Sequence, residues 1–158
     1  MTLMMLDFAT AATLLCVVAT ALVGGVFFAF SSFVMPALAR LSAPDGIRAM
    51  QSINITAVRP PLMTALFGTA VLGITGAIVR SGQPWMLAAA ALYVVGVIGV
   101  TIVAHVPRND ALARVDAAVA PGAEDAWRQY LTGWRRWNHV RWISGVASSA
   151  AFLVAAMA

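Results

Sequence analysis

The side chains best suited to chemistry in this sequence gather in one short segment, GWRRWNHVRW, from Gly133 to Trp142. It holds three tryptophans, three arginines, an asparagine and a histidine, directly before an apolar run. Arginine and asparagine can donate hydrogen bonds to an oxyanion, histidine can act as a general base, and tryptophan rings can line an apolar slot. The same composition is also typical of a membrane-interface anchor. The segment therefore indicates either an anchor or one wall of a pocket.

Further polar candidates lie at the ends of other apolar runs. Charged and amide side chains are costly inside lipid, so they cluster in cavities or at interfaces. The full set is Asn54, Arg59, His105, Asn109, Asp110, Asn138, His139 and Arg141. Each has a plainer role open to it, because arginines can extend toward lipid headgroups and Asn109 can cap a helix. A site built from this set must be assembled by elements that are far apart in the sequence.

The two histidines, His105 and His139, raise the question of a metal or haem site. No His-x-x-x-His pair, Glu-x-x-His motif or carboxylate cluster accompanies them, and Cys16 is the only cysteine. The sequence also lacks a glycine-rich phosphate loop, a nucleophile elbow and a Cys-x-x-Cys motif. We therefore predict no metal and no cofactor.

The composition excludes a water-soluble domain. Hydrophobic residues make up 61% of the 158 residues and charged residues only 10%, whereas soluble domains contain about 25% charged residues. The net charge of +4 comes from ten arginines without any lysine, spread thinly between apolar runs. That distribution fits membrane topology better than nucleic-acid binding. We expect a membrane protein whose main partner is the lipid bilayer, with no nucleic-acid partner.

Four apolar runs are long enough for the roughly 20 residues that a membrane-spanning helix needs. They are residues 8–39, 60–79, 84–106 and 137–158. The segment RSGQP between the second and third runs predicts a tight turn. The expected fold is an all-α, integral membrane four-helix bundle in a single domain, residues 1–158.

The arginines predict the orientation of these spans. The two long connections contain Arg40, Arg48, Arg59, Arg108, Arg114, Arg128, Arg135 and Arg136, whereas the short turn contains only Arg80. Because positive loops stay in the cytoplasm, both termini should lie outside. We expect the membrane to be a bacterial inner (plasma) membrane. The candidate polar residues then share the cytoplasmic side.

Both long connections have helical patterns. Residues 42–58 place apolar side chains on one face, with Ser42 as a helix cap. Residues 106–122 begin with a proline stop at Pro107, and Asn109 could cap a helix after it. We expect a short amphipathic helix in each connection.

Helical geometry divides the polar residues of the last span, which has no strong breaker after Ala123 and can therefore begin in the cytoplasm. At about 100° per residue, one face contains Trp127, Tyr130, Trp134, Trp137, Asn138, Arg141, Gly145 and Ser148. Small residues in membrane helices mark close helix contacts, so this face should point inward. His139 lies away from it.

In the first span, Gly24, Phe28, Ser31 and Met35 share a face. This pattern fits either helix packing or a flat apolar slot.

Four motifs follow one another along the sequence: FFAFSSFVMPAL, MQSIN followed by RPP, HVPRNDALA, and WRRWNHVR. Together they resemble the anthrone oxygenase-like family of small four-helix membrane proteins. Characterised members oxidise an anthrone to an anthraquinone with O2, without an evident metal or flavin. One motif departs from the family pattern, because HVPRN stands where NVPLN is expected, so that His105 and Arg108 replace an amide and an apolar residue.

The resemblance implies a flat apolar slot, a base for the acidic CH2 group of the substrate, and donors for the resulting oxyanion. His139 or His105 would be the base, and Asn138, Asn109 and Arg141 would be the donors. The substrate-binding residues would be Trp134, Trp137, Phe28, Ser31, Asn54, Arg59 and Asp110. Molecular oxygen would be the co-substrate, and the substrate a hydrophobic aromatic or quinone-like small molecule.

Three other classes stay open from the sequence. The protein could bind or transport a hydrophobic compound without chemistry, act as an accessory scaffold, or take part in haem- or quinone-linked redox reactions through its histidines. A homo-oligomer is also open. We favour a pocket facing the cytoplasm for a flat aromatic molecule, with anthrone-type oxygenation as the activity.

Overall fold

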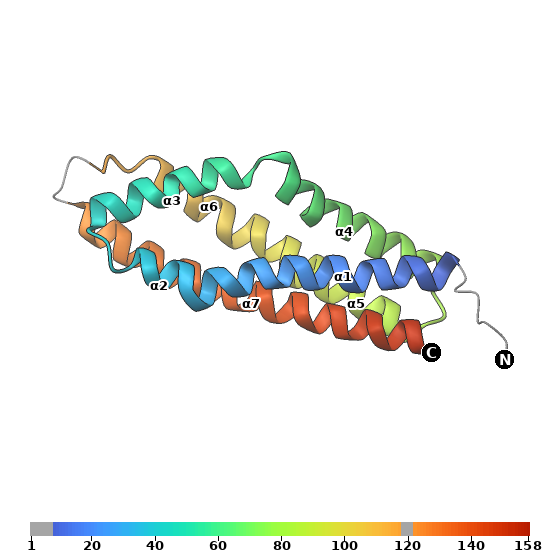
Figure 1. Ribbon diagram of the computed structural model, residues 1–158. Coiled ribbons are helices and arrows are strands. Elements are labelled where there is room, and N and C mark those ends of the chain that lie inside the picture. Colours follow the sequence, from blue (N-terminus) through green and yellow to red (C-terminus); the bar gives the residue numbers. More distant parts are fainter. Residues whose placement is uncertain (1–7, 118–121) are drawn as a thin grey trace.

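Four long apolar helices run side by side in the computed structural model, which describes residues 8–117 and 122–158 (Figure 1). They span Phe8–Leu38, Pro60–Val79, Pro84–Ala113 and Ala123–Met157, each long and apolar enough to cross a membrane. The described ranges contain no strand. The prediction of an all-α membrane bundle is therefore confirmed.

The helices divide into shorter elements where their winding changes. The first is α1 (Phe8–Ala29), a π-helical turn η1 (Phe30–Val34) and α2 (Met35–Leu38). The third is α5 (Pro84–Tyr93), two π-helical segments, η2 (Val94–Gly99) and η3 (Thr101–His105), and then α6 (Val106–Ala113). The others are the short α3 (Ala43–Ala57), α4 (Pro60–Val79) and the long α7 (Ala123–Met157).

Two of the π-helical segments have an identifiable cause. Pro36 follows η1 by two residues, and Pro107 follows η3 by two residues. A proline inside a helix has no N–H group, and its ring clashes with the carbonyl four residues earlier. A wider turn just before the proline relieves that clash without ending the helix.

This explains why the predicted stop at Pro107 is wrong. The third helix continues through Pro107 to Ala113, so Asn109 lies within α6 and is no helix cap. Two other expectations are confirmed: Ser42 caps α3 by accepting a hydrogen bond from the Asp45 N–H at 3.3 Å, and α7 runs unbroken from Ala123.

The closest helix contact joins α1 and α7 through two glycines. A Cβ atom added to Gly145 would lie 3.0 Å from the Cα of Gly24, so larger residues would force the helices apart. Ser148 and Ser149 of α7 donate hydrogen bonds to main-chain carbonyls of α5 and α1, at 2.8 and 3.0 Å. Small residues and serine hydroxyls thus hold α7 against its neighbours, and the glycine face of α1 is a packing face.

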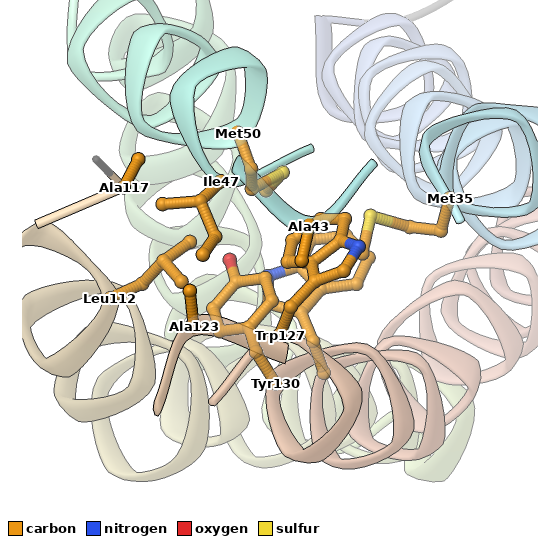
Figure 2. Packing of buried hydrophobic residues seen from close by; sticks show 10 residues of the cluster. Met35, Ala43, Ile47, Met50, Leu112, Ala117, Ala123, Trp127 and Tyr130 are labelled. Carbon is orange, nitrogen blue, oxygen red and sulfur yellow. The ribbon is translucent and has the colours of Figure 1, made fainter. Parts of the chain in front are cut away.

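The end of the bundle that contains α3, here called the α3 end, is closed by an apolar cluster (Figure 2). The cluster consists of Met35, Ala43, Ile47, Met50, Leu112, Ala117, Ala123, Trp127, Tyr130 and Trp134. Trp127 and Tyr130 stack with their ring planes 12° apart. Gln51 of α3 donates hydrogen bonds to the carbonyls of Leu112 and Val115, at 2.9 and 3.0 Å. These contacts fix α3 across α6 and α7.

Candidate functional site

The inward face of α7 is largely as predicted. Buried on it are Trp127, Tyr130, Trp134, Asn138, Arg141, Gly145 and Ser148. Trp137 lies at the edge of this face and is 37% exposed. The long helix therefore places an amide, a guanidinium and an indole inside the bundle.

Both N–H groups of the Asn138 side-chain amide donate hydrogen bonds within the protein. Its Nδ2 donates to the carbonyl of Phe27 and to the hydroxyl of Ser31, both at 2.7 Å. Its Oδ1 accepts a hydrogen bond from Arg141 at 2.6 Å. The residue is completely buried, and a ligand could receive no hydrogen bond from it. Ser31 therefore helps to position Asn138, and Asn138 in turn positions Arg141.

Arg141 reaches into the bundle between two aromatic rings. Its Cζ lies 3.9 Å from the ring centre of Phe27 and 5.3 Å from that of Trp134, both cation–π distances. Its Nη1 donates to the hydroxyl of Thr101 at 3.3 Å. Its Nε is buried, and no atom of the described residues accepts its hydrogen. One donor of the guanidinium is thus left for another acceptor.

His105 is buried beside this arginine on the π-helical segment η3, with 1% of its surface exposed. Its ring meets Trp134 edge-on, with centroids 4.8 Å apart. The main chain of Trp137 lies near the imidazole, but neither ring nitrogen forms a hydrogen bond with any described residue. Buried polar atoms in proteins are nearly always paired, so orphaned nitrogens need an explanation.

A cavity of about 190 Å³ connects these groups. Its polar lining consists of Asn54, Thr101, His105, Asn109 and Arg141. Most of its wall is apolar and comes from α1, η1, α3, α4, η3, α6 and α7, including Phe27, Met50, Leu66 and Trp134. Asn109 accepts a hydrogen bond of 2.8 Å from the Tyr130 hydroxyl, which Asn54 also approaches.

The other candidates lie away from the cavity. Phe28 is 51% exposed and meets Trp142 edge-on with ring centroids 5.4 Å apart. His139 is exposed and accepts a hydrogen bond of 3.0 Å from Trp142. Arg59 is exposed at the start of α4, and Asp110 is exposed in a groove beside α6.

The histidines are therefore not brought together, since one is buried and the other faces outward. Within residues 8–117 and 122–158, no group of three or more His, Cys, Asp or Glu side chains could hold a metal ion.

Several lining residues could not be found from the sequence. Thr101 accepts its hydrogen bond from Arg141 at the start of η3, after the π-helical segment η2 has changed the register along the third helix. The wall from α4 consists of Leu62, Met63, Leu66 and Phe67, which look like any lipid-facing residues in the sequence. No signal in either stretch distinguishes a cavity wall from a membrane face.

A family model described as anthrone oxygenase matches residues 48–154, from within α3 to near the end of α7. The match therefore includes every polar residue that lines the cavity. Comparison with curated proteins gave no match. Comparison with solved structures also gave no match. The family match covers more than half of the sequence, and on that basis the chain belongs to the anthrone oxygenase family.

Proposed function

We propose that the cavity binds a flat apolar aromatic molecule with a carbonyl or phenolic oxygen, and that the protein oxygenates it with O2. The observation that supports this most is the pairing of orphaned groups in one apolar space. Both ring nitrogens of His105 and the Nε of Arg141 are buried without a partner among the described residues, and both side chains line the cavity. A ligand oxygen between them would receive a hydrogen bond, and an acidic C–H could reach the imidazole.

The chemistry starts with removal of a proton from the CH2 group of an anthrone by His105. The negative charge moves to the oxygen of the anthrone carbonyl group, where the Nε of Arg141 stabilises it. The anion transfers one electron to O2, and the radical pair combines to a peroxide anion at the former CH2 carbon. Protonated His105 returns its proton to this anion and gives the hydroperoxide. Loss of water leaves a ketone. One oxygen atom of O2 enters the product, the other leaves as water, and the anion itself supplies the electron, so no cofactor is needed.

His105 stands where the family resemblance leads us to expect an amide. The base would therefore be a feature of this chain, while the arginine, its supporting Asn138 and the indole of Trp134 would serve any related substrate. His139 does not share this role, because it is exposed and is not among the residues that line the cavity.

For the orientation in the membrane, we propose that the α3 end faces the cytoplasm of a bacterial inner membrane. Eight of the ten arginines lie between Arg40 and Arg59 or between Arg108 and Arg136, a stretch that ends within the first half of α7, whereas Arg80 is in the turn at the opposite end. The positive-inside rule then places the cavity near the cytoplasmic leaflet. An apolar substrate would reach it from the same leaflet or from the cytoplasm.

The test is oxygenation by the purified protein in detergent or lipid nanodiscs, with anthrone and ¹⁸O2. We expect O2 uptake that depends on the protein, and an anthraquinone product with one ¹⁸O atom in the new ketone. The rate in protein-free detergent gives the spontaneous reaction. If the protein does not accelerate product formation above that rate, the proposed activity is wrong.

A further inference from the structure

We infer that substrates enter the cavity through the groove between α3 and α6, and that Val58 and Val106 set the width of this entrance. The inference rests on the proposed binding function of the cavity. It assigns to two exposed valines a role in substrate selection that the chemistry inside the cavity does not require.

The groove between α3 and α6 borders the cavity directly. The groove has a volume of about 450 Å³ and is lined by Gln51, Asn54, Ile55, Val58, Val106, Asn109, Asp110 and Ala113. Four of these residues, Asn54, Val58, Val106 and Asn109, also line the cavity. These two amides and two valines therefore form the boundary between the two spaces, which is here called the throat.

A second groove of similar size provides the contrast. It lies between α6 and α7, has a volume of about 460 Å³, and is lined by Pro107, Arg108, Ala111, Leu112, Val115, Ala126, Gln129, Tyr130 and Gly133. None of its lining residues lines the cavity. Of these two grooves on either side of α6, only the one beside α3 shares lining residues with the cavity.

Hydrogen bonds restrain α3 and one of the two amides at the throat. Gln51 ties α3 to the end of α6 with hydrogen bonds of 2.9 and 3.0 Å. Asn109 is held by the Tyr130 hydroxyl at 2.8 Å. In contrast, Val58 is 67% exposed and Val106 is 45% exposed. These two valines are therefore the members of the throat that can be enlarged without disturbing the packing.

A competing route leads sideways from the bilayer. Phe67 of α4 and Ile102 of η3 also line the cavity and are 46% and 55% exposed. The groove beside α3 suits an aromatic molecule with an oxygen better, because the amides of Asn54 and Asn109 can hydrogen-bond that oxygen during passage. The lateral route offers only apolar contacts at these two positions.

The experiment measures access of a small apolar reagent to the cavity. Cys16, the only cysteine, is replaced by alanine, and Leu66→Cys places a thiol deep in the cavity, at a side chain that is 2% exposed. Membranes are treated with N-ethylmaleimide, and labelling is followed by mass spectrometry. Met63→Cys is the second reporter if Leu66→Cys does not fold. We expect steady labelling of this single thiol in the parent protein, which carries the Cys16 replacement and the reporter cysteine and has no change at the throat.

Val58→Trp and Val106→Trp should each slow labelling about tenfold, equivalent to about 1.4 kcal/mol in the barrier. Ala111→Trp is the matched control, since Ala111 is exposed in the groove beside α7, and it should leave the rate unchanged. Slower labelling in Ile102→Trp with unchanged rates in both valine variants would overturn the inference in favour of the lateral route. A parent thiol that never reacts would overturn it as well. Labelling needs no turnover, so a failed entrance is distinguishable from a failed oxygenase.

Discussion

The Nη2 atom of Arg141 donates a hydrogen bond of 2.6 Å to the Oδ1 of Asn138, one turn earlier on the same helix. The guanidinium forms no ion pair with any carboxylate of the described residues. Its surroundings are an amide, a hydroxyl and two aromatic rings, all of them neutral. A buried positive charge without a counter-charge is costly. An anionic ligand in the cavity would offset that cost.

Replacing Arg141 with lysine should therefore separate charge from geometry. Lysine keeps a positive charge but loses the planar set of donors that binds Asn138 and Thr101 while leaving Nε free. We expect the variant to fold and to bind anthraquinone, but with kcat lower by a factor of about 10²–10³, the usual effect of losing one oxyanion donor. Steady-state kinetics measure this. An unchanged kcat would mean that the charge alone is sufficient.

The supporting network behind the arginine predicts a graded effect on stability. Asn138→Ala leaves the Phe27 carbonyl, the Ser31 hydroxyl and Arg141 without their shared partner, which should cost about 1–3 kcal/mol of unfolding free energy. Ser31→Ala removes one hydrogen bond and should cost less. The exposed Ser32 bonds only to its own helix, so Ser32→Ala is the matched control. Thermal unfolding in detergent would show this order, and equal melting temperatures for all three would contradict it.

The two histidines form a matched pair for the proposed base. His105→Asn keeps a polar side chain in the cavity but removes the base, and should lower kcat by a factor of about 10²–10⁴. His139→Asn changes an exposed residue on the other side of α7 and should have little effect. Anthrone turnover is the measurement. A large loss in the His139 variant with full activity in the His105 variant would reverse the assignment.

The close packing of α3 against α7 at the α3 end can be tested by replacing one glycine. A Cβ atom at Gly46 would lie 2.6 Å from the indole of Trp127, so Gly46→Ala must displace α3 or the ring. Overpacking of this kind costs about 1–3 kcal/mol. At Gly25, by comparison, an added Cβ atom meets nothing within 4 Å. We expect a lower melting temperature for Gly46→Ala only, and Gly25→Ala at or above the wild-type value.

Much of this architecture could be predicted from the sequence, because lipid imposes simple rules. Uninterrupted apolar runs predicted the four spanning helices. The helical period predicted that Asn138 and Arg141 point into the bundle and that His139 lies away from that face. Both results depend only on hydropathy and on a regular α-helix. They hold for α7 because this helix has no proline and no change of winding from Ala123 to Met157.

The remaining features depend on departures from that regularity. The π-helical segments η2 and η3 change the register between α5 and α6, so a constant helical period counted from Pro84 does not give the face that Thr101 and His105 present to the cavity. Phe28 follows the period along α1, but which face of α1 borders the cavity depends on where α4 and α7 pack. Pairwise packing of apolar helices leaves little trace in composition.

The most direct test of the proposed site is a structure determined with anthraquinone, the reaction product, in lipid nanodiscs. We expect the flat ring system to lie against Trp134, with one carbonyl oxygen within hydrogen-bonding distance of the Arg141 Nε and the opposite edge facing His105. A ring system bound elsewhere, for example between Phe28 and Trp142 on the outer surface, with the cavity unchanged, would contradict it.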